Sequence, residues 1–170
     1  MAHKHTGKIF IGIILLLLIF TVLGFWLWPR PAAKIVIPAS ISRQYNFQPL
    51  ITNSSTPAQV SEVSKTLKYD KQNKVLSFVT VVDNKHVTIS EQAYPEVLVY
   101  DTLVNGFNVY STLNLKGGEE VYLGHPGNAP SGDQAAVTRT DSLLIFGKPD
   151  QNLSNDQWRT VFDNLVAVTQ

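Results

Sequence analysis

Several carboxylates could serve as general acids or bases, Glu91, Glu96, Glu119 and Glu120 among them. Acid–base catalysis needs such groups within reach of the same substrate atoms. Glu119 and Glu120 are neighbours on an expected strand, so their side chains point to opposite faces of it. The sequence also lacks a GxSxG nucleophile elbow. It therefore predicts no catalytic residue, and we expect a protein that is not an enzyme.

Metal ligation is the second chemistry to consider. The chain has no cysteine, which excludes disulfides, thiolate nucleophiles and cysteine-bound metals. His3 and His5 lie in the N-terminal tail, while His86 and His125 stand beside expected turns. A metal site needs three or four converging ligands, and no HExxH spacing joins these histidines. We predict no metal site and no cofactor.

Two loops have the composition of ligand-binding loops. Residues 124–132 (GHPGNAPSG) are rich in glycine, but a phosphate-binding loop also needs a lysine and a following helix. Residues 150–156 place oxygen-bearing side chains at alternate positions, as calcium loops do. However, Asn155 replaces the sharp-turn glycine, and Val161 stands where the bidentate glutamate belongs. We interpret the first segment as an inter-strand loop and the second as a turn with a helix cap.

The longest apolar segment runs from Ile9 to Trp28 (IFIGIILLLLIFTVLGFWLW) and carries no charge. A helix of this length extends about 30 Å, the thickness of a bilayer's hydrocarbon core. Pro29 and Pro31 then stop the helix. The sequence therefore predicts a transmembrane helix over residues 9–28. The residues expected to contact lipid include Ile9, Leu16, Phe20, Trp26 and Trp28.

A cleaved signal peptide is the alternative interpretation of this segment. It would have an apolar core of about 7–15 residues followed by a small-x-small site. Arg30 or Pro31 stands where the second small residue should be. We therefore favour a retained signal anchor.

The orientation of the helix follows from its flanking charges. Lys4 and Lys8 precede it, and Arg30 and Lys34 follow it, which gives a small bias toward a cytoplasmic N-terminus. The polar, weakly charged remainder suits an extracytoplasmic setting. We expect a single-pass protein of the plasma membrane with residues 1–8 inside and the C-terminal domain outside.

The remainder of the chain divides into a tether and one domain. Residues 29–40 (PRPAAKIVIPAS) have the proline content of a semi-stiff spacer. Residues 41–170 are numerous enough to bury a core. Past Ile35 there are 10 basic and 13 acidic residues, a net charge of −3. Since nucleic acid binding needs a clustered basic face, nucleic acid is not an expected partner.

Alternating apolar residues predict an antiparallel sheet. The residues Val63, Leu67 and Tyr69 share a parity, so we expect a strand within 61–70, with a helix over 60–67 as the alternative. Residues 45–51 are compatible with a first strand. The remaining strands, joined mainly by short turns, are expected at 75–82, 86–92, 107–115, 119–125, 135–140 and 142–147.

Two helices complete the pattern. Pro95 at the first helical position and Gly106 past the end predict a middle helix over 94–106. Ser154 and Gln157 fit a capping box that begins a C-terminal helix. Its staple and apolar stripe comprise Leu153, Trp158, Val161, Phe162 and Leu165. The fold class is α+β: an N-terminal transmembrane helix, then an antiparallel sheet of about six to seven strands in two meanders, covered by the two helices.

Two segments carry a resemblance to a class of bacterial proteins. They are the hairpin KVLSFVTVVDNKHVTISEQ and the ending VTRTDSLLIFGKPDQNLSNDQWRTVFDNL. Their pattern resembles extracytoplasmic domains of unknown function on single-pass membrane proteins, including anti-sigma-factor-like sensors and lipoprotein-carrier-like domains. The resemblance implies an envelope location and, for the carriers, an apolar ligand. Only eight residues precede the anchor, which argues against an anti-sigma role.

We expect a membrane-anchored, non-enzymatic binding or interaction module of the cell envelope. Its partners are the lipid bilayer through residues 9–28 and an envelope protein or an apolar ligand. An apolar-ligand carrier or sensor is the second hypothesis, which requires a sizeable apolar cavity. A membrane-tethered hydrolase is the third, which requires perturbed titratable groups in a cleft. The sequence does not give the oligomeric state.

Overall fold

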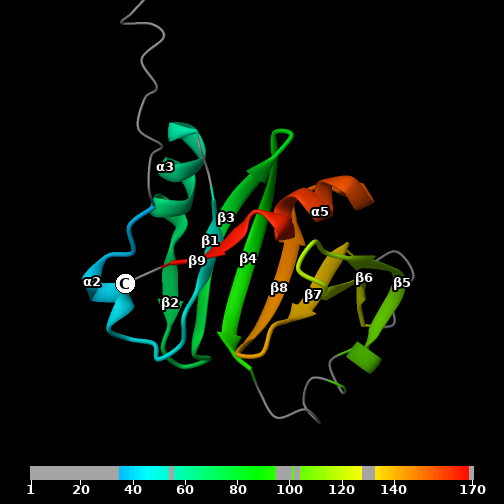
Figure 1. Cartoon of the computed structure of the whole chain (residues 1–170), viewed down its shortest axis with the longest axis horizontal. Coiled ribbons are helices and arrows are strands. Elements are labelled where there is room, and N and C mark those ends of the chain that lie inside the picture. The colour runs from blue at the N-terminus through cyan, green and yellow to red at the C-terminus, as the bar shows by residue number, and fades with distance from the viewer. Residues whose placement is uncertain (1–34, 54–55, 95–100, 102–103, 128–132, 169–170) are drawn as a thin grey trace, which may run out of the picture. The chain divides into compact units, whose positions relative to one another are not determined.

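The computed structural model describes residues 35–53, 56–94, 101, 104–127 and 133–168. These residues form an α+β domain around a seven-stranded antiparallel sheet of order β2-β3-β4-β8-β7-β6-β5 (Figure 1). The order contains the two predicted meanders, β2-β3-β4 and β5-β6-β7-β8. The structure adds that the pair β4–β8 joins them. The strands are β2 Lys68–Asp70, β3 Val75–Val82, β4 Lys85–Ala93, β5 Phe107–Asn114, β6 Glu120–Pro126, β7 Ala135–Arg139 and β8 Leu143–Pro149.

The strand expected within residues 61–70 is mostly helical, which corrects that prediction. Helix α3 spans Pro57–Thr66, and only Lys68–Asp70 pairs as β2. Thr56 caps the helix because its Oγ1 accepts a hydrogen bond from the N–H of Gln59 at 3.4 Å. Val63 and Leu67 stand four positions apart, a spacing that also suits one helix face.

Helix α3 also protects the edge of β3 beyond the end of β2. The Val79 N–H donates to Oγ1 of Thr66 at 2.8 Å, and Nε2 of Gln59 donates to the Val81 carbonyl at 2.9 Å. Backbone groups of β3 that would otherwise be open to another strand are thus hydrogen-bonded to the helix, which protects this exposed edge of the sheet.

The C-terminal helix α5 spans Asn155–Asp163 and has the predicted capping box. Oγ of Ser154 accepts from the Gln157 N–H at 3.2 Å, and Oε1 of Gln157 accepts from the Ser154 N–H at 3.0 Å. Trp158 and Phe162 are buried against the sheet and stack with ring centroids 5.8 Å apart. Gly147 of β8 lies under Trp158, since a Cβ there would stand 2.8 Å from the Trp158 ring.

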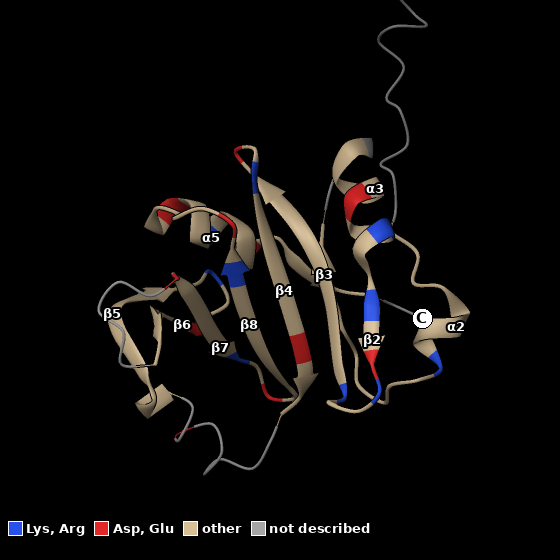
Figure 2. Ribbon diagram, turned by 180° about the vertical axis from the view of Figure 1, so that it is seen from behind, with Lys and Arg blue, Asp and Glu red and all other residues tan. Residues whose placement is uncertain are grey.

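A separate two-stranded ribbon pairs β1, Leu50–Thr52, with β9, Leu165–Ala167. Figures 1 and 2 show it on the same face of the sheet as α5. The strand compatible with residues 45–51 is thus short, and it joins this ribbon instead of the large sheet. Leu165, expected on the stripe of α5, lies in β9 because the helix ends at Asp163.

The folded domain begins earlier than the expected boundary at residue 41. Ile35 is only 7% exposed in the core, and Ala39–Ser42 form the short helix α2. The last residues of the expected tether are therefore held by apolar packing. Residues 29–34 and the predicted transmembrane segment 9–28 lie outside the described residues. Within the part that is described, no helix is long and apolar enough to cross a membrane.

The second face of the sheet carries a smaller apolar cluster. Val137 and Leu144 are buried there, and Tyr94, Val104 and Phe107 pack around them with neighbours from β6 and β8. Most of the predicted middle helix lies outside the described residues. The positions described within it after Tyr94 are helical at Asp101, Val104 and Asn105.

Candidate ligand pocket

Glu91 occupies a core position in β4. The strand alternates, with Val87, Ile89 and Glu91 buried between more exposed neighbours. Glu91 is the acidic residue of this strand, the red band within β4 in Figure 2. Its partners across the sheet are Leu76 in β3 and Ile145 in β8. A carboxyl group thus lies among apolar side chains and is 0% exposed.

The ribbon supplies the hydrogen bond that Glu91 receives. Its Oε2 accepts from the backbone N–H of Leu50 at 3.1 Å. In an antiparallel pair only every second residue of a strand bonds to its partner. Pro49 and Asn53 make bonds to the β9 side, so the Leu50 N–H faces away from β9 and reaches Glu91.

The second oxygen of Glu91, Oε1, has no hydrogen-bond partner among the described groups. Burial raises the pKa of Glu91 to about 8, and the hydrogen bond from Leu50 offsets only part of that rise. Because a charged carboxylate without a counter-ion is costly in an apolar interior, the group is mainly protonated at neutral pH.

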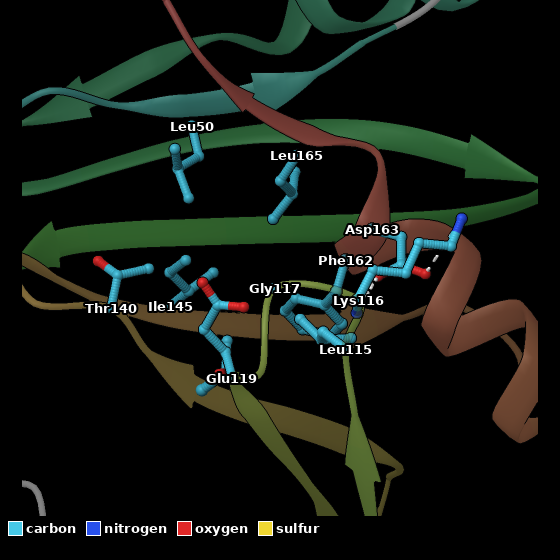
Figure 3. A pocket seen from close by; sticks show the side chains of 11 residues that line it. Leu50, Leu115, Lys116, Gly117, Glu119, Thr140, Ile145, Phe162, Asp163 and Leu165 are labelled. Carbon is cyan, nitrogen blue, oxygen red and sulfur yellow. Dashed lines mark hydrogen bonds and ion pairs between the residues drawn. The ribbon is translucent and has the colours of Figure 1, made fainter.

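A pocket of about 200 Å³ lies beside Glu91, between the ribbon, the end of α5 and the β5–β6 turn. Two residues that line the pocket also contact Glu91. Leu50 donates a hydrogen bond to Glu91, and Ile145 is its partner across the sheet. Figure 3 shows their side chains on opposite walls, with Leu165 beside Leu50. Its apolar lining comprises Leu50, Leu115, Ile145, Phe162 and Leu165.

Three charged residues form the rim of this pocket: Lys116, Glu119 and Asp163. The Asp163 side chain is only 14% exposed, and its Oδ1 accepts from the Lys116 N–H at 3.2 Å. The Lys116 ammonium stands 3.9 Å from Oδ2 of Asp163 but is 88% exposed, so this ion pair is loose. Glu119 makes no salt bridge within the described part of the chain.

The β5–β6 turn brings Glu119 to the rim. Its carboxylate lies against Gly117, where a Cβ would collide with it. Gly118 has φ +92, a conformation that favours glycine. The adjacent Glu120 instead accepts a hydrogen bond from the Tyr122 hydroxyl at 2.8 Å. Glu91 and Glu119 are thus near one pocket, Glu120 is directed elsewhere, and Glu96 lies outside the described residues.

The histidines considered above do not converge with these groups. His86 bonds through Nδ1 to Asp150 at 3.2 Å on the surface. The His125 ring packs against Tyr110 in a tilted arrangement, with ring centroids 5.2 Å apart. His3 and His5 are not among the described residues. Across the described ranges, no three histidine or carboxylate side chains gather as a metal site would require.

The two candidate loops also have local partners. Asp150 receives the His86 N–H at 3.0 Å, and Asp156 pairs with Arg159 at 2.9 Å. Residues 128–132 of the glycine-rich segment lie outside the described residues. The pocket itself was not predicted, because the contributions of Leu50, Lys116 and Asp163 depend on long-range pairing. The core parity of Glu91 with Val87 and Ile89 was the available signal.

Comparison with known proteins gives no relative: no family model, curated protein or solved structure matches the chain.

Proposed function

We propose that this chain is a membrane-anchored, non-enzymatic binding module of the cell envelope whose pocket beside Glu91 takes one small apolar group of a ligand or partner. The observation that carries the proposal is the solvent-open pocket of about 200 Å³ with leucine, isoleucine and phenylalanine side chains in its lining. Concave sites with an apolar lining and a few polar groups are the usual form of binding sites.

The volume favours a small group over a lipid. A cavity of about 150 Å³ with a similar lining accommodates benzene, whereas pockets for drug-sized ligands measure about 300–1,000 Å³. A pocket of about 200 Å³ suits one ring or a short alkyl chain. The carrier hypothesis, which needs room for whole acyl chains, has less support from this geometry.

A tethered hydrolase has less support as well. Glu91 has a raised pKa, but hydrolysis needs a second group that acts on the same atoms. Glu91 does not line the pocket, whereas the carboxylates Glu119 and Asp163 do, so Glu91 is not placed to act with them on one bound group.

The proposed location of the protein is the plasma membrane, with residues 1–8 inside and the domain from Ile35 outside. Its support is the run of uncharged, mainly bulky residues over 9–28, which is more stable in hydrocarbon than in water. In this arrangement the anchor keeps the domain on the side of the membrane where envelope proteins are found.

The binding proposal is tested with 1-butanol, a short, water-soluble alkyl probe. The full chain in zwitterionic nanodiscs is labelled at isoleucine and leucine methyl groups, and methyl resonances are followed by nuclear magnetic resonance. We expect saturable shifts of the Ile145 and Leu165 methyls. Leu165→Trp should fill the pocket and abolish the Ile145 shift.

The matched control is Val166→Trp, because Val166 is the next residue of β9 and is 41% exposed. It adds the same ring outside the pocket and should leave the butanol response unchanged. A response that never saturates, or one equal in both tryptophan variants, would refute the proposed binding site.

A further inference from the structure

The pocket is lined by more negatively charged than positively charged side chains. Glu119 and Asp163 contribute two carboxylates to the rim, and Lys116 contributes one ammonium. Asp163 is mostly buried; it accepts a hydrogen bond from the Lys116 N–H, and its only salt bridge in the described part of the chain is the loose pair with the Lys116 ammonium. A cation at the rim would therefore gain more than an anion, since opposite charges within a few ångströms attract and like charges repel.

Lys116 already places an alkylammonium at this rim. Its Nζ is 3.9 Å from Asp163, yet its side chain is 88% exposed, so it makes little use of the apolar lining. A ligand with the same charged end and an apolar stem could pair with the carboxylates and also bury its stem. Long amphipathic side chains behave in this way, with a buried stem and a hydrated head.

Glu91 adds little charge near this pocket at neutral pH, because burial raises its pKa to about 8. It is 0% exposed and its Oε1 has no described partner. It does not line the pocket, but Leu50, which donates to it, and Ile145, which pairs with it across the sheet, both do. The charge preference of the pocket therefore rests on Glu119, Asp163 and Lys116.

We infer that the group bound in this pocket is a short alkylammonium, with its stem against Leu50, Ile145 and Phe162 and its charged end beside Glu119 and Asp163. This inference rests on the proposed binding function and names its ligand class. A stem of about four to six carbons matches the volume, by comparison with a cavity of about 150 Å³ that accommodates benzene. The ammonium belongs either to a free amine or to a lysine side chain of a partner.

The test compares isosteric probes on the full chain in zwitterionic nanodiscs. The probes are n-butylammonium, 1-butanol and butyrate, each titrated at pH 7 while the Ile145 methyl resonance is followed. We expect n-butylammonium to bind about two- to five-fold more tightly than 1-butanol, the range of an exposed ion pair. Butyrate should bind more weakly than either.

Rim variants locate the charge effect. Glu119→Gln and Asp163→Asn should each weaken n-butylammonium binding about two- to five-fold and leave 1-butanol binding unchanged. Lys116→Gln should strengthen n-butylammonium binding, because it removes a competing cation. Glu120→Gln is the matched control, since that neighbour bonds to Tyr122, and it should change neither affinity.

The outcomes separate the two proposals. If 1-butanol binds and n-butylammonium gains nothing over it, the ligand class is wrong while the binding site stands. If no probe gives a saturable shift, the binding function fails and the ligand class fails with it.

A further titration distinguishes the two sources of the ammonium and uses Nα-acetyl-lysine methylamide. Binding of this probe indicates a partner's lysine, and binding of n-butylammonium alone indicates a free amine.

Discussion

The backbone N–H of Leu50 donates a 3.1 Å hydrogen bond to the carboxyl of Glu91, 41 positions away in the chain. This bond links the β1–β9 ribbon to the seven-stranded sheet, two sheets with no strand pairing between them in the described structure. The Glu91 end of the bond is titratable. Protonation of one side chain is therefore coupled to the stability of the ribbon that forms one wall of the pocket.

The first prediction concerns stability against pH. The pKa of Glu91 rises from 4.5 to about 8 on folding, because burial disfavours its charged form. Between these values the folded state holds a proton that the unfolded state has released. The contribution of Glu91 is thus fully present below pH 4.5 and is lost as pH rises to about 8, at up to roughly 1.4 kcal/mol per pH unit.

The measurement is urea unfolding of the full chain at several pH values between 5 and 9, followed by circular dichroism. Glu91→Gln is the control, since its amide stays neutral and its oxygen still accepts from Leu50. The free energy of unfolding of the native chain should fall relative to this variant as pH rises, then run parallel to it above about pH 8. Parallel curves throughout would exclude a raised pKa.

The second prediction concerns the contact between Gly147 and Trp158. Gly147→Ala places a methyl group 2.8 Å from Cζ3 of Trp158. We expect a loss of about 1–3 kcal/mol in the free energy of unfolding, since packed interiors resist added volume. Trp158→Phe removes the contacting ring atoms, so the two changes together should cost less than the sum of their single costs. Additive costs would show that the two residues are not coupled.

The third prediction separates ligand binding from stability. Gly117→Ala adds a methyl group where the Glu119 carboxylate lies, and the end of that flexible side chain can move aside. The free energy of unfolding should change by less than about 0.5 kcal/mol. Binding of n-butylammonium should weaken as it does in Glu119→Gln. Unchanged binding would mean that Glu119 acts from a different position.

The fourth prediction concerns topology. A protease added to intact cells or spheroplasts should remove the domain and leave the segment 9–28 in the membrane, detected by an epitope at the N-terminus. The reason is the expected orientation, with Lys4 and Lys8 on the cytoplasmic side. Full protection of the domain, in cells where a known external protein is digested, would reverse the orientation.

Local patterns were sufficient for strands β3 to β8 and for helix α5. The alternation in residues 75–82 and the capping box at Ser154 and Gln157 involve neighbours in the chain, so the sequence contains them directly. Residues 61–66 were misassigned because Val63 and Leu67 satisfy both a strand parity and a helix spacing. The cap at Thr56 and Pro57 resolves that ambiguity in favour of a helix.

The ribbon and the pocket could not be predicted in the same way. The pairing of Leu50 with Ala167 joins residues that are distant in the chain, and no short pattern encodes it. Glu91 shares its parity with Val87 and Ile89, but a carboxylate is seldom placed in a core without a partner. The ribbon explains its burial, because it brings the Leu50 N–H within hydrogen-bonding distance of the carboxyl group.

The β1–β9 pairing also sets the order in which the molecule can become functional. Leu50 emerges from the ribosome long before Leu165, and both form walls of the same pocket. A chain still being synthesised therefore has the sheet strands but no closed site. The proposed binding site is complete only when the β9 segment has been released and has paired with β1.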